Sequence, residues 1–226
     1  MKRILTTIFC LFLCCSVFAQ SGVDTLHYRK VYYFGGTGMG FPLGKTKEVL
    51  SPKFSGSLGL DISLKNPKYY LYPALYTLSF DYDQKIQDNQ YPFKIEDANA
   101  NFYTFSLAGG IRKQLKKLNA YAYAGPGVGL LTEPRVKVDA MNNIAKIENQ
   151  KKFSFSGKLG VGADYRFNGF FLGLEIGYLH SFNKIQETPI NIMTVMVGLK
   201  SDITGLGDKV IKVIGVEGSI SGKEQQ

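Results

Sequence analysis

Between residues 153 and 182 the sequence alternates between apolar and polar side chains. From Phe153 to Phe167 the odd positions carry Phe, Phe, Gly, Leu, Val, Ala, Tyr and Phe, whereas the even positions carry Ser, Lys, Gly, Asp and Arg. Because the side chains of a strand point alternately to opposite faces, this pattern predicts a strand with one apolar and one polar face. Asn168-Gly169 follows, and this dipeptide favours a two-residue type I′ turn. The next strand has its apolar residues at even positions from Phe170 to Tyr178.

The length of the predicted turn determines which residues of the two strands lie opposite each other, and so whether their apolar sets share a face. A two-residue loop places Phe167 opposite Phe170, and the following pairs are Tyr165 with Leu172, Ala163 with Leu174 and Val161 with Ile176. Odd positions therefore face even positions, and both apolar sets fall on one side of the hairpin.

Similar patterns predict eight strands, which cover residues 31–41, 54–64, 70–82, 102–112, 120–131, 153–167, 170–182 and 190–200. Ordinary strands have about 5 or 6 residues, whereas a strand that spans a membrane needs about 9 to 11. All eight have the length of membrane-spanning strands. In the third strand we assign the even set, from Tyr70 to Tyr82, to the apolar outer face, and the odd set, which includes Leu71, Leu75 and Asp81, to the inner face.

The predicted connections are alternately long and short. Their lengths are 12, 5, 19, 7, 21, 2 and 7 residues, and the long ones at 83–101 and 132–152 are rich in charged and amide residues. Short periplasmic turns and longer outer loops are typical of outer-membrane barrels. An even strand count with a long first connection places both ends of the barrel on the short-turn side.

Aromatic residues concentrate near the predicted strand ends, as in the interfacial girdles of membrane barrels. Near the short turns they are Tyr70, Tyr72, Tyr121, Tyr123, Tyr165, Phe167 and Phe170. Near the long connections they are Phe80, Tyr82, Tyr103, Phe153, Phe155 and Phe182. The alternative interpretation is that aromatic residues simply favour strands.

With these features the chain, from about Tyr28 to Lys200, resembles the outer membrane protein β-barrel domain family, the small OmpA/OmpX-type barrels. The resemblance implies an all-β fold, an eight-stranded antiparallel up-and-down transmembrane β-barrel in the outer membrane. It also implies outer-membrane lipid and lipopolysaccharide as surroundings, and a non-enzymatic structural, adhesion or assembly role through the outer loops.

The amino terminus has the features of an export signal. Lys2 and Arg3 precede a short apolar run, and Val17 and Ala19 suit cleavage after residue 19. We therefore predict a signal peptide at 1–19, a barrel at 20–200 and a periplasmic tail at 201–226 that is a possible docking segment for a periplasmic partner. All three cysteines lie in the signal, so the mature chain can form neither disulfides nor thiolate metal sites.

If the apolar face contacts lipid, the other face lines the barrel. It carries four acids and four bases, namely Asp61, Asp81, Asp164, Glu175, Arg112, Lys158, Arg166 and Lys200. Buried charges persist when they are paired and hydrogen-bonded, so we interpret this set as a structural plug. A narrow polar channel or a proton-linked site is the alternative. Glu175 lies between the levels of Lys158 and Arg166, and either could reach it.

Other motifs do not indicate a cofactor. Gly44-Lys45-Thr46 lacks the upstream glycine of a phosphate loop, which argues against nucleotide binding. Two histidines, His27 and His180, are too few for a multi-histidine metal site. The net charge of +9 comes from scattered basic residues, which argues against nucleic-acid binding and suits anionic headgroups.

Two other functions remain open from the sequence. The first is a secreted lipocalin-like barrel, in which the apolar set would face inward around an apolar ligand. The second is a membrane-embedded lipid hydrolase that would use His180, although Ser181 is adjacent and therefore points to the opposite face of the strand.

Overall fold

The computed structural model describes residues 30–85, 95, 97–139 and 144–205, so the predicted signal peptide and residues 206–226 of the predicted tail lie outside the described residues. The elements are β1 (Val31–Pro42), a short 3-10 helix η1 (Gly44–Glu48), β2 (Leu50–Pro52), β3 (Phe54–Ser63), β4 (Tyr69–Tyr82), β5 (Ala98–Leu115), β6 (Leu118–Asp139), β7 (Ile144–Arg166), β8 (Phe171–Ile185) and β9 (Thr188–Asp202).

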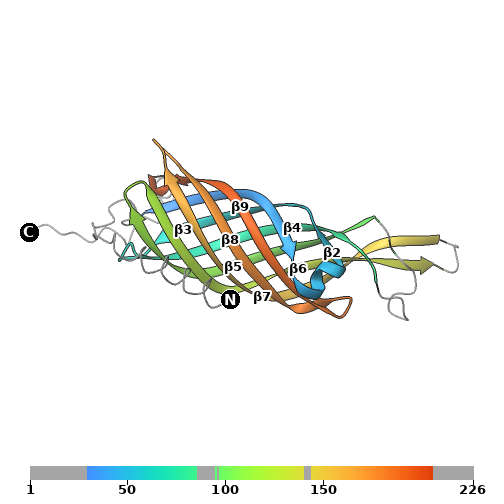
Figure 1. Cartoon of the computed structure of the whole chain (residues 1–226). Helices are drawn as coiled ribbons and strands as arrows, with labels where there is room; N and C mark the ends of the chain where they lie inside the picture. The colour runs from blue at the N-terminus through green and yellow to red at the C-terminus, as the bar shows by residue number, and fades with distance from the viewer. Residues whose placement is uncertain (1–29, 86–94, 96, 140–143, 206–226) are drawn as a thin grey trace, which may run out of the picture.

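The eight long strands form a closed antiparallel ring (Figure 1). Each strand pairs with its neighbours in the order β1, β3, β4, β5, β6, β7, β8 and β9, and β9 pairs with β1 to close it. The three residues of β2 pair with the outer end of β4, beside β3. The predicted all-β, eight-stranded fold is therefore confirmed. No helix in the described part of the chain is long and apolar enough to cross a membrane.

The register predicted for the β7–β8 hairpin is confirmed. Val161 lies opposite Ile176, Ala163 opposite Leu174 and Tyr165 opposite Leu172. The turn type differs from the prediction, because Gly169 has a φ of +96° but Asn168 has no positive φ. Two successive positive φ values, as in a type I′ turn, occur instead between β8 and β9, at Gln186 (46°) and Glu187 (61°).

The predicted loop at 132–152 is wrong. β6 continues to Asp139 and β7 begins at Ile144, with pairs that include Thr132 with Lys151 and Val136 with Ile147. Figure 1 shows this hairpin (yellow) extending past the other strands at one end of the barrel. Both faces of a two-stranded ribbon in water are solvated, so its sequence needs no apolar alternation. Its backbone groups are nonetheless satisfied by the partner strand.

The outer wall carries the apolar residues that alternation predicted in β3, β5, β7 and β8. They include Phe54, Leu58, Tyr103, Phe105, Leu107, Ile111, Phe153, Phe155, Leu159, Val161, Leu172, Leu174 and Ile176, all exposed. A contiguous apolar surface of this extent marks contact with another apolar phase. Around a closed barrel that phase is the membrane hydrocarbon.

β4 has the opposite orientation to the one predicted. Its even-numbered side chains, including Tyr72, Tyr76 and Phe80, are buried inside the barrel, and Leu71 and Leu75 are exposed on the outer wall. Both faces of this strand are apolar, so alternation alone could not decide between them. The orientation of β4 follows from its pairing with β3, because directly opposed residues share a face. Leu75 lies opposite Leu58, which is on the outer wall.

Glycines inside the barrel make room for tyrosine rings. A Cβ atom at Gly162 would lie 2.3 Å from the Tyr121 ring, and one at Gly110 would lie 2.3 Å from the Tyr70 ring. In each case the tyrosine and the glycine are directly opposed on neighbouring strands. The ring therefore lies over a position without a side chain, and several large aromatic residues fit in a narrow lumen.

We expect Gly162→Val to lower the free energy of unfolding by about 1–3 kcal/mol, because the new side chain overlaps Tyr121. The matched control is Gly157→Val on the same strand, where a Cβ atom would have no neighbour within 4 Å. Urea unfolding in detergent micelles, followed by the mobility of the folded form on unboiled gels, measures both. Equal stability of the two variants would contradict the crowding of this position.

Candidate functional site in the barrel lumen and at its outer rim

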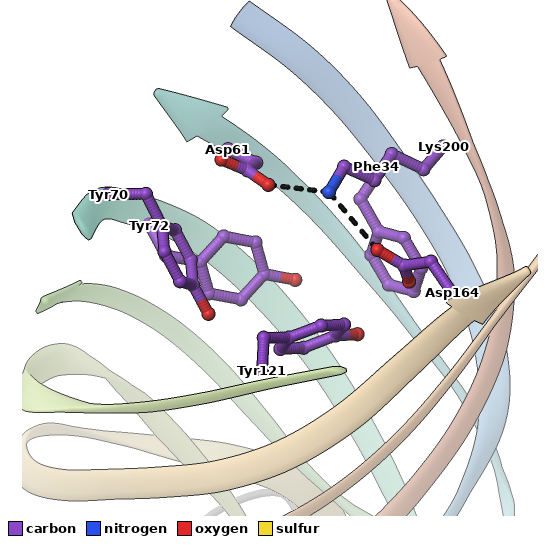
Figure 2. Close-up of a pocket in the computed structure, with 7 residues that line it drawn as sticks. All are labelled: Phe34, Asp61, Tyr70, Tyr72, Tyr121, Asp164 and Lys200. Atoms are coloured by element: carbon purple, nitrogen blue, oxygen red, sulfur yellow. Dashed lines mark hydrogen bonds and ion pairs between the residues drawn. The ribbon is translucent and has the colours of Figure 1, made fainter. Parts of the chain in front are cut away.

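A network of four charged side chains occupies the end of the lumen next to the short turns, and Figure 2 shows three of them, Asp61, Asp164 and Lys200. Lys200 Nζ lies 2.6 Å from Asp61 Oδ2 and 3.1 Å from Asp164 Oδ2. Arg112 Nη1 donates to Asp61 Oδ2 at 2.7 Å. All four residues are buried, and they come from β3, β5, β7 and β9.

Neutral side chains complete this network. Asn119 Nδ2 donates to Asp164 Oδ2 at 3.1 Å, and Arg112 Nη2 donates to Ser63 Oγ at 3.1 Å. The Arg112 guanidinium also lies 4.5 Å from the centre of the Tyr70 ring. Two acids and two bases therefore balance in a setting where unpaired charges would be costly.

The space left beside this network is small. A cavity of about 10 Å³ is lined by Phe34, Asp61, Tyr70, Tyr72, Tyr121, Asp164 and Lys200 (Figure 2). A cavity needs at least about 10–15 Å³ to hold one water molecule. The cavity therefore has room for one water molecule at most, and side chains fill this end of the barrel.

Glu175 on β8 lies at the centre of a second cluster, which sequence reasoning missed. Its Oε1 accepts hydrogen bonds from the Tyr123 hydroxyl at 2.6 Å and the Tyr76 hydroxyl at 3.0 Å, and its Oε2 accepts one from Tyr72 at 3.1 Å. Glu175 is fully buried. Three phenol donors thus replace the water around one carboxylate, and hydrogen bonds to a charged acceptor are stronger than neutral ones.

Lys158 lies next to this cluster without pairing directly with Glu175. Its Nζ donates to Thr194 Oγ1 at 2.8 Å and lies 3.9 Å from the centre of the Tyr76 ring. The tyrosines, rather than Lys158 or Arg166, therefore make the hydrogen bonds to Glu175.

The outer half of the lumen contains a layer of large apolar side chains, which the predicted polar interior did not include, beside small polar residues such as Ser154 and Ser181. Its buried side chains include Leu78, Phe80, Phe102, Leu131, Leu179, Ile190 and Ile192. Phe80 and Phe102 meet edge to face with their centres 5.8 Å apart. An apolar layer of this kind disfavours water and ions in this part of the lumen.

A third ionic cluster closes the outer rim. Buried Glu133 accepts hydrogen bonds from Lys152 Nζ at 2.7 Å, Tyr82 at 3.2 Å and Arg135 Nη2 at 3.3 Å. The sequence did not indicate this cluster because residue 133 was assigned to a loop. Beside it, η1 is held against β9, since Thr46 Oγ1 donates to the Pro189 carbonyl at 2.9 Å and accepts from Asn191 N at 3.0 Å.

Six of the eight predicted interior charges lie in the lumen. They are Asp61, Arg112, Lys158, Asp164, Glu175 and Lys200. The prediction is wrong for Asp81, which is on the outer side of β4 and pairs with Lys53 at 2.7 Å. It is also wrong for Arg166, which is exposed where β7 ends.

The prediction of two aromatic girdles is right for seven residues and wrong for six. Tyr103, Phe153, Phe155 and Phe182 are exposed toward the outer end, and Tyr165, Phe167 and Phe170 are exposed toward the short turns. The other six members, Tyr70, Tyr72, Phe80, Tyr82, Tyr121 and Tyr123, belong to the interior instead.

His180 does not form a nucleophile pair with its neighbour. Its Nδ1 lies 2.8 Å from Asn191 Oδ1, whereas Ser181 is buried on the other face and shares a hydrogen bond of 2.8 Å with Ser154 Oγ. Throughout the described ranges, no three His, Cys, Asp or Glu side chains are grouped so that they could hold a metal ion.

The closed ring, the apolar outer wall and the filled, charged lumen together define a small outer-membrane β-barrel. The chain belongs to the outer membrane protein beta-barrel domain family, whose model matches residues 7–200. Its cellular location is therefore the outer membrane, where lipid and lipopolysaccharide surround it. No curated protein matches the sequence at a significant level.

Several solved barrels resemble the fold at low sequence identity. Neisserial surface protein A matches with a TM-score of 0.52 and 8% identity, covering 76% of this chain and 96% of that chain. The attachment invasion locus protein Ail of Yersinia pestis, solved with the heparin analogue sucrose octasulfate, gives 0.43 and 10% identity, covering 76% and 99%. The N-terminal barrel of Pseudomonas aeruginosa OprF gives 0.40 and 13% identity, covering 76% and 98%.

Proposed function

We propose that this protein is a non-catalytic surface protein whose closed barrel anchors the protruding β6–β7 hairpin as a contact surface for adhesion or assembly. The observation that carries the proposal is the continuous pairing of the two strands from Thr132–Lys151 to Asp139–Ile144, beyond the rest of the barrel (Figure 1). A paired ribbon holds its side chains in fixed positions, as a recognition surface requires.

The filled lumen supports an anchoring role over a transport role. From the short turns to the outer rim it contains the Asp61 network, the Glu175 cluster, the apolar layer and the Glu133 cluster. An eight-stranded barrel is just wide enough for side chains to fill its interior. These layers argue against a continuous water path through the lumen.

The lumen-side face of the hairpin favours an anionic partner. A groove of about 540 Å³ on this face is lined by Arg135, Lys137, Glu148, Asn149, Gln150 and Lys152. Lys137 forms an exposed ion pair with Glu148, with 3.7 Å between Nζ and Oε2, and it also lies directly opposite exposed Lys146. Like charges in this arrangement are unfavourable, and a bound anion would relieve their repulsion.

We expect the double substitution Lys137→Glu/Lys146→Glu to reduce the binding of dextran sulfate to cells that display the protein by about tenfold or more. Two lysines near an anionic surface contribute about 1 kcal/mol each, and the new glutamates add repulsion. Lys47→Glu/Lys184→Glu is the control, because it makes the same change of charge at exposed residues outside the hairpin. Equal losses in both variants, or equal binding of neutral dextran, would contradict a hairpin-specific site.

The closed lumen is tested by a separate measurement. The purified protein in a planar bilayer is expected to show no steady ion conductance, because apolar and ionic layers block the pore. A stable open channel in the intact chain would overturn the anchoring proposal and favour the narrow-channel alternative. The predicted docking of a periplasmic partner concerns the tail, 201–226, of which residues 206–226 lie outside the described residues.

A further inference from the structure

The outer wall has an apolar groove of about 530 Å³ across β4, β5 and β6, near the short turns. In one row Leu71 lies opposite Gly109, which lies opposite Ala124, and in the next row Ile111 lies opposite Ala122. Small side chains form the floor, and Leu71 and Ile111 stand higher because their side chains are larger. The groove is shallow and open along its length, so it would contact one side of a lipid chain.

No side chain of the described protein fills this groove. A Cβ atom at Gly109 would have no neighbour within 4 Å, and the φ of Gly109 is not one that demands glycine. This differs from inward-facing Gly110, where Tyr70 occupies the space. Because the groove lies on the hydrocarbon-facing wall, an apolar chain has to occupy it for good packing.

The end of the groove nearest the short turns is strongly basic. Lys65 and Lys68 belong to the β3–β4 turn, and Lys116 and Lys117 form the β5–β6 turn. Lys113 is two residues beyond Ile111 on the same outward face of β5, and the Lys68 carbonyl accepts a hydrogen bond from Arg112 N at 2.8 Å, which joins the two regions.

These five lysines lie in segments of the chain that contain no acidic residue. Residues 64–68 and 113–119 contain no Asp or Glu. All five lysines are exposed, and none forms an ion pair with a residue in the described part of the chain. An anionic group at this level of the barrel would therefore meet several uncompensated positive charges.

We propose that this groove and its lysines bind one anionic glycerophospholipid of the periplasmic leaflet. One acyl chain lies along Gly109, Ala122 and Ala124, and the phosphate lies between Lys68 and Lys113. The short turns of such barrels face the periplasm, so the lysines are at the level of the inner-leaflet headgroups. Lipopolysaccharide, which also carries acyl chains and phosphates, would require its phosphates at the opposite rim.

The headgroup part is tested with the full mature chain in detergent by native mass spectrometry. Phosphatidylglycerol and phosphatidylcholine with the same acyl chains are titrated separately. We expect one phosphatidylglycerol per barrel, bound at least tenfold more tightly than phosphatidylcholine. Lys68→Gln/Lys113→Gln should weaken phosphatidylglycerol binding by about 25-fold, about fivefold for each lysine. It should weaken phosphatidylcholine binding less, because the choline ammonium already offsets the charge of that lipid's phosphate. Equal affinities of the two lipids for the unaltered protein would overturn the proposal.

The groove part is tested by Gly109→Leu, which fills the space from a position where a Cβ atom has no protein neighbour within 4 Å. We expect this change to weaken the binding of both lipids by about tenfold or more. Gly157→Leu is the control, because Gly157 also has open space around its Cβ position but lies outside the groove, on β7. Both variants must keep the folded mobility on unboiled gels.

Three further results would overturn the assignment. The first is unchanged lipid binding in the folded Gly109→Leu variant. The second is a dimer that Gly109→Leu abolishes, because the groove would then hold a second copy of the chain. The third is lipopolysaccharide binding that depends on Lys68 and Lys113 as strongly as phosphatidylglycerol binding does.

Discussion

Replacing Glu175 by alanine is expected to lower the free energy of unfolding by about 3–5 kcal/mol, the usual cost of removing one partner from a buried charged network. The substitution removes the carboxylate that accepts hydrogen bonds from Tyr72, Tyr76 and Tyr123, and leaves Tyr76 and Tyr123 only the 3.2 Å contact between their own hydroxyls. It also leaves the buried Lys158 ammonium without the nearby negative charge. Urea unfolding in micelles, followed by gel mobility, measures the change.

Two further variants separate the causes of this loss. Glu175→Gln keeps one oxygen acceptor and should lose less stability than Glu175→Ala. Ile176→Ala changes the next residue, which faces lipid, and serves as the control for truncation on the same strand. Combining Glu175→Ala with Lys158→Met should cost less than the sum of the single changes, because it removes both buried charges. A Glu175→Ala loss below about 1 kcal/mol would contradict the central role of this carboxylate.

Lys200→Met is expected to lower the free energy of unfolding by a similar amount, about 3–5 kcal/mol, because the Lys200 ammonium forms ion pairs with both Asp61 and Asp164. Without it, two buried carboxylates face the single charge of Arg112, whose contact is with Asp61. Lys200→Arg should recover part of the loss by restoring the charge. The same unfolding assay compares the three proteins.

The control for this second change is the surface ion pair between Lys30 and Asp202 at 2.7 Å. Both side chains are more than one-third exposed, and exposed pairs typically contribute less than about 1 kcal/mol. Lys30→Met should therefore have little effect. If Lys30→Met and Lys200→Met destabilise the protein equally, the Asp61 network does not contribute as a buried unit.

The strands were predictable where one face was apolar and the other polar or small. β7 and β8 meet this condition, and their register followed because a two-residue connection leaves few alternatives. The extension of β6 and β7 past residue 131 was not predictable by the same signal, because a solvated ribbon shows no apolar alternation.

The charges of the lumen were predictable on strands whose faces were already assigned. Asp61, Asp164 and Glu175 lie on such strands, and the structure places all three inside. Asp81 was misplaced because β4 is apolar on both faces, so the choice between its two orientations depended on pairing with β3 and β5.

Local sequence patterns could not predict the Glu175 cluster, because its members are far apart in the chain. Tyr72, Tyr76 and Tyr123 are separated from Glu175 by 103, 99 and 52 positions. Their aromatic rings resemble the side chains of an interfacial girdle, and only the inward orientation of β4 and β6 turns their hydroxyls toward one carboxylate.

The sequence by itself determined the number of long strands, their antiparallel order and the apolar outer wall, because strand periodicity and short turns act over neighbouring residues. Only the tertiary structure decided which face of β4 points inward, where the buried charges meet and where the wall is hollow. These features depend on cross-strand neighbours around a closed ring, and closure brings together side chains that no local pattern relates.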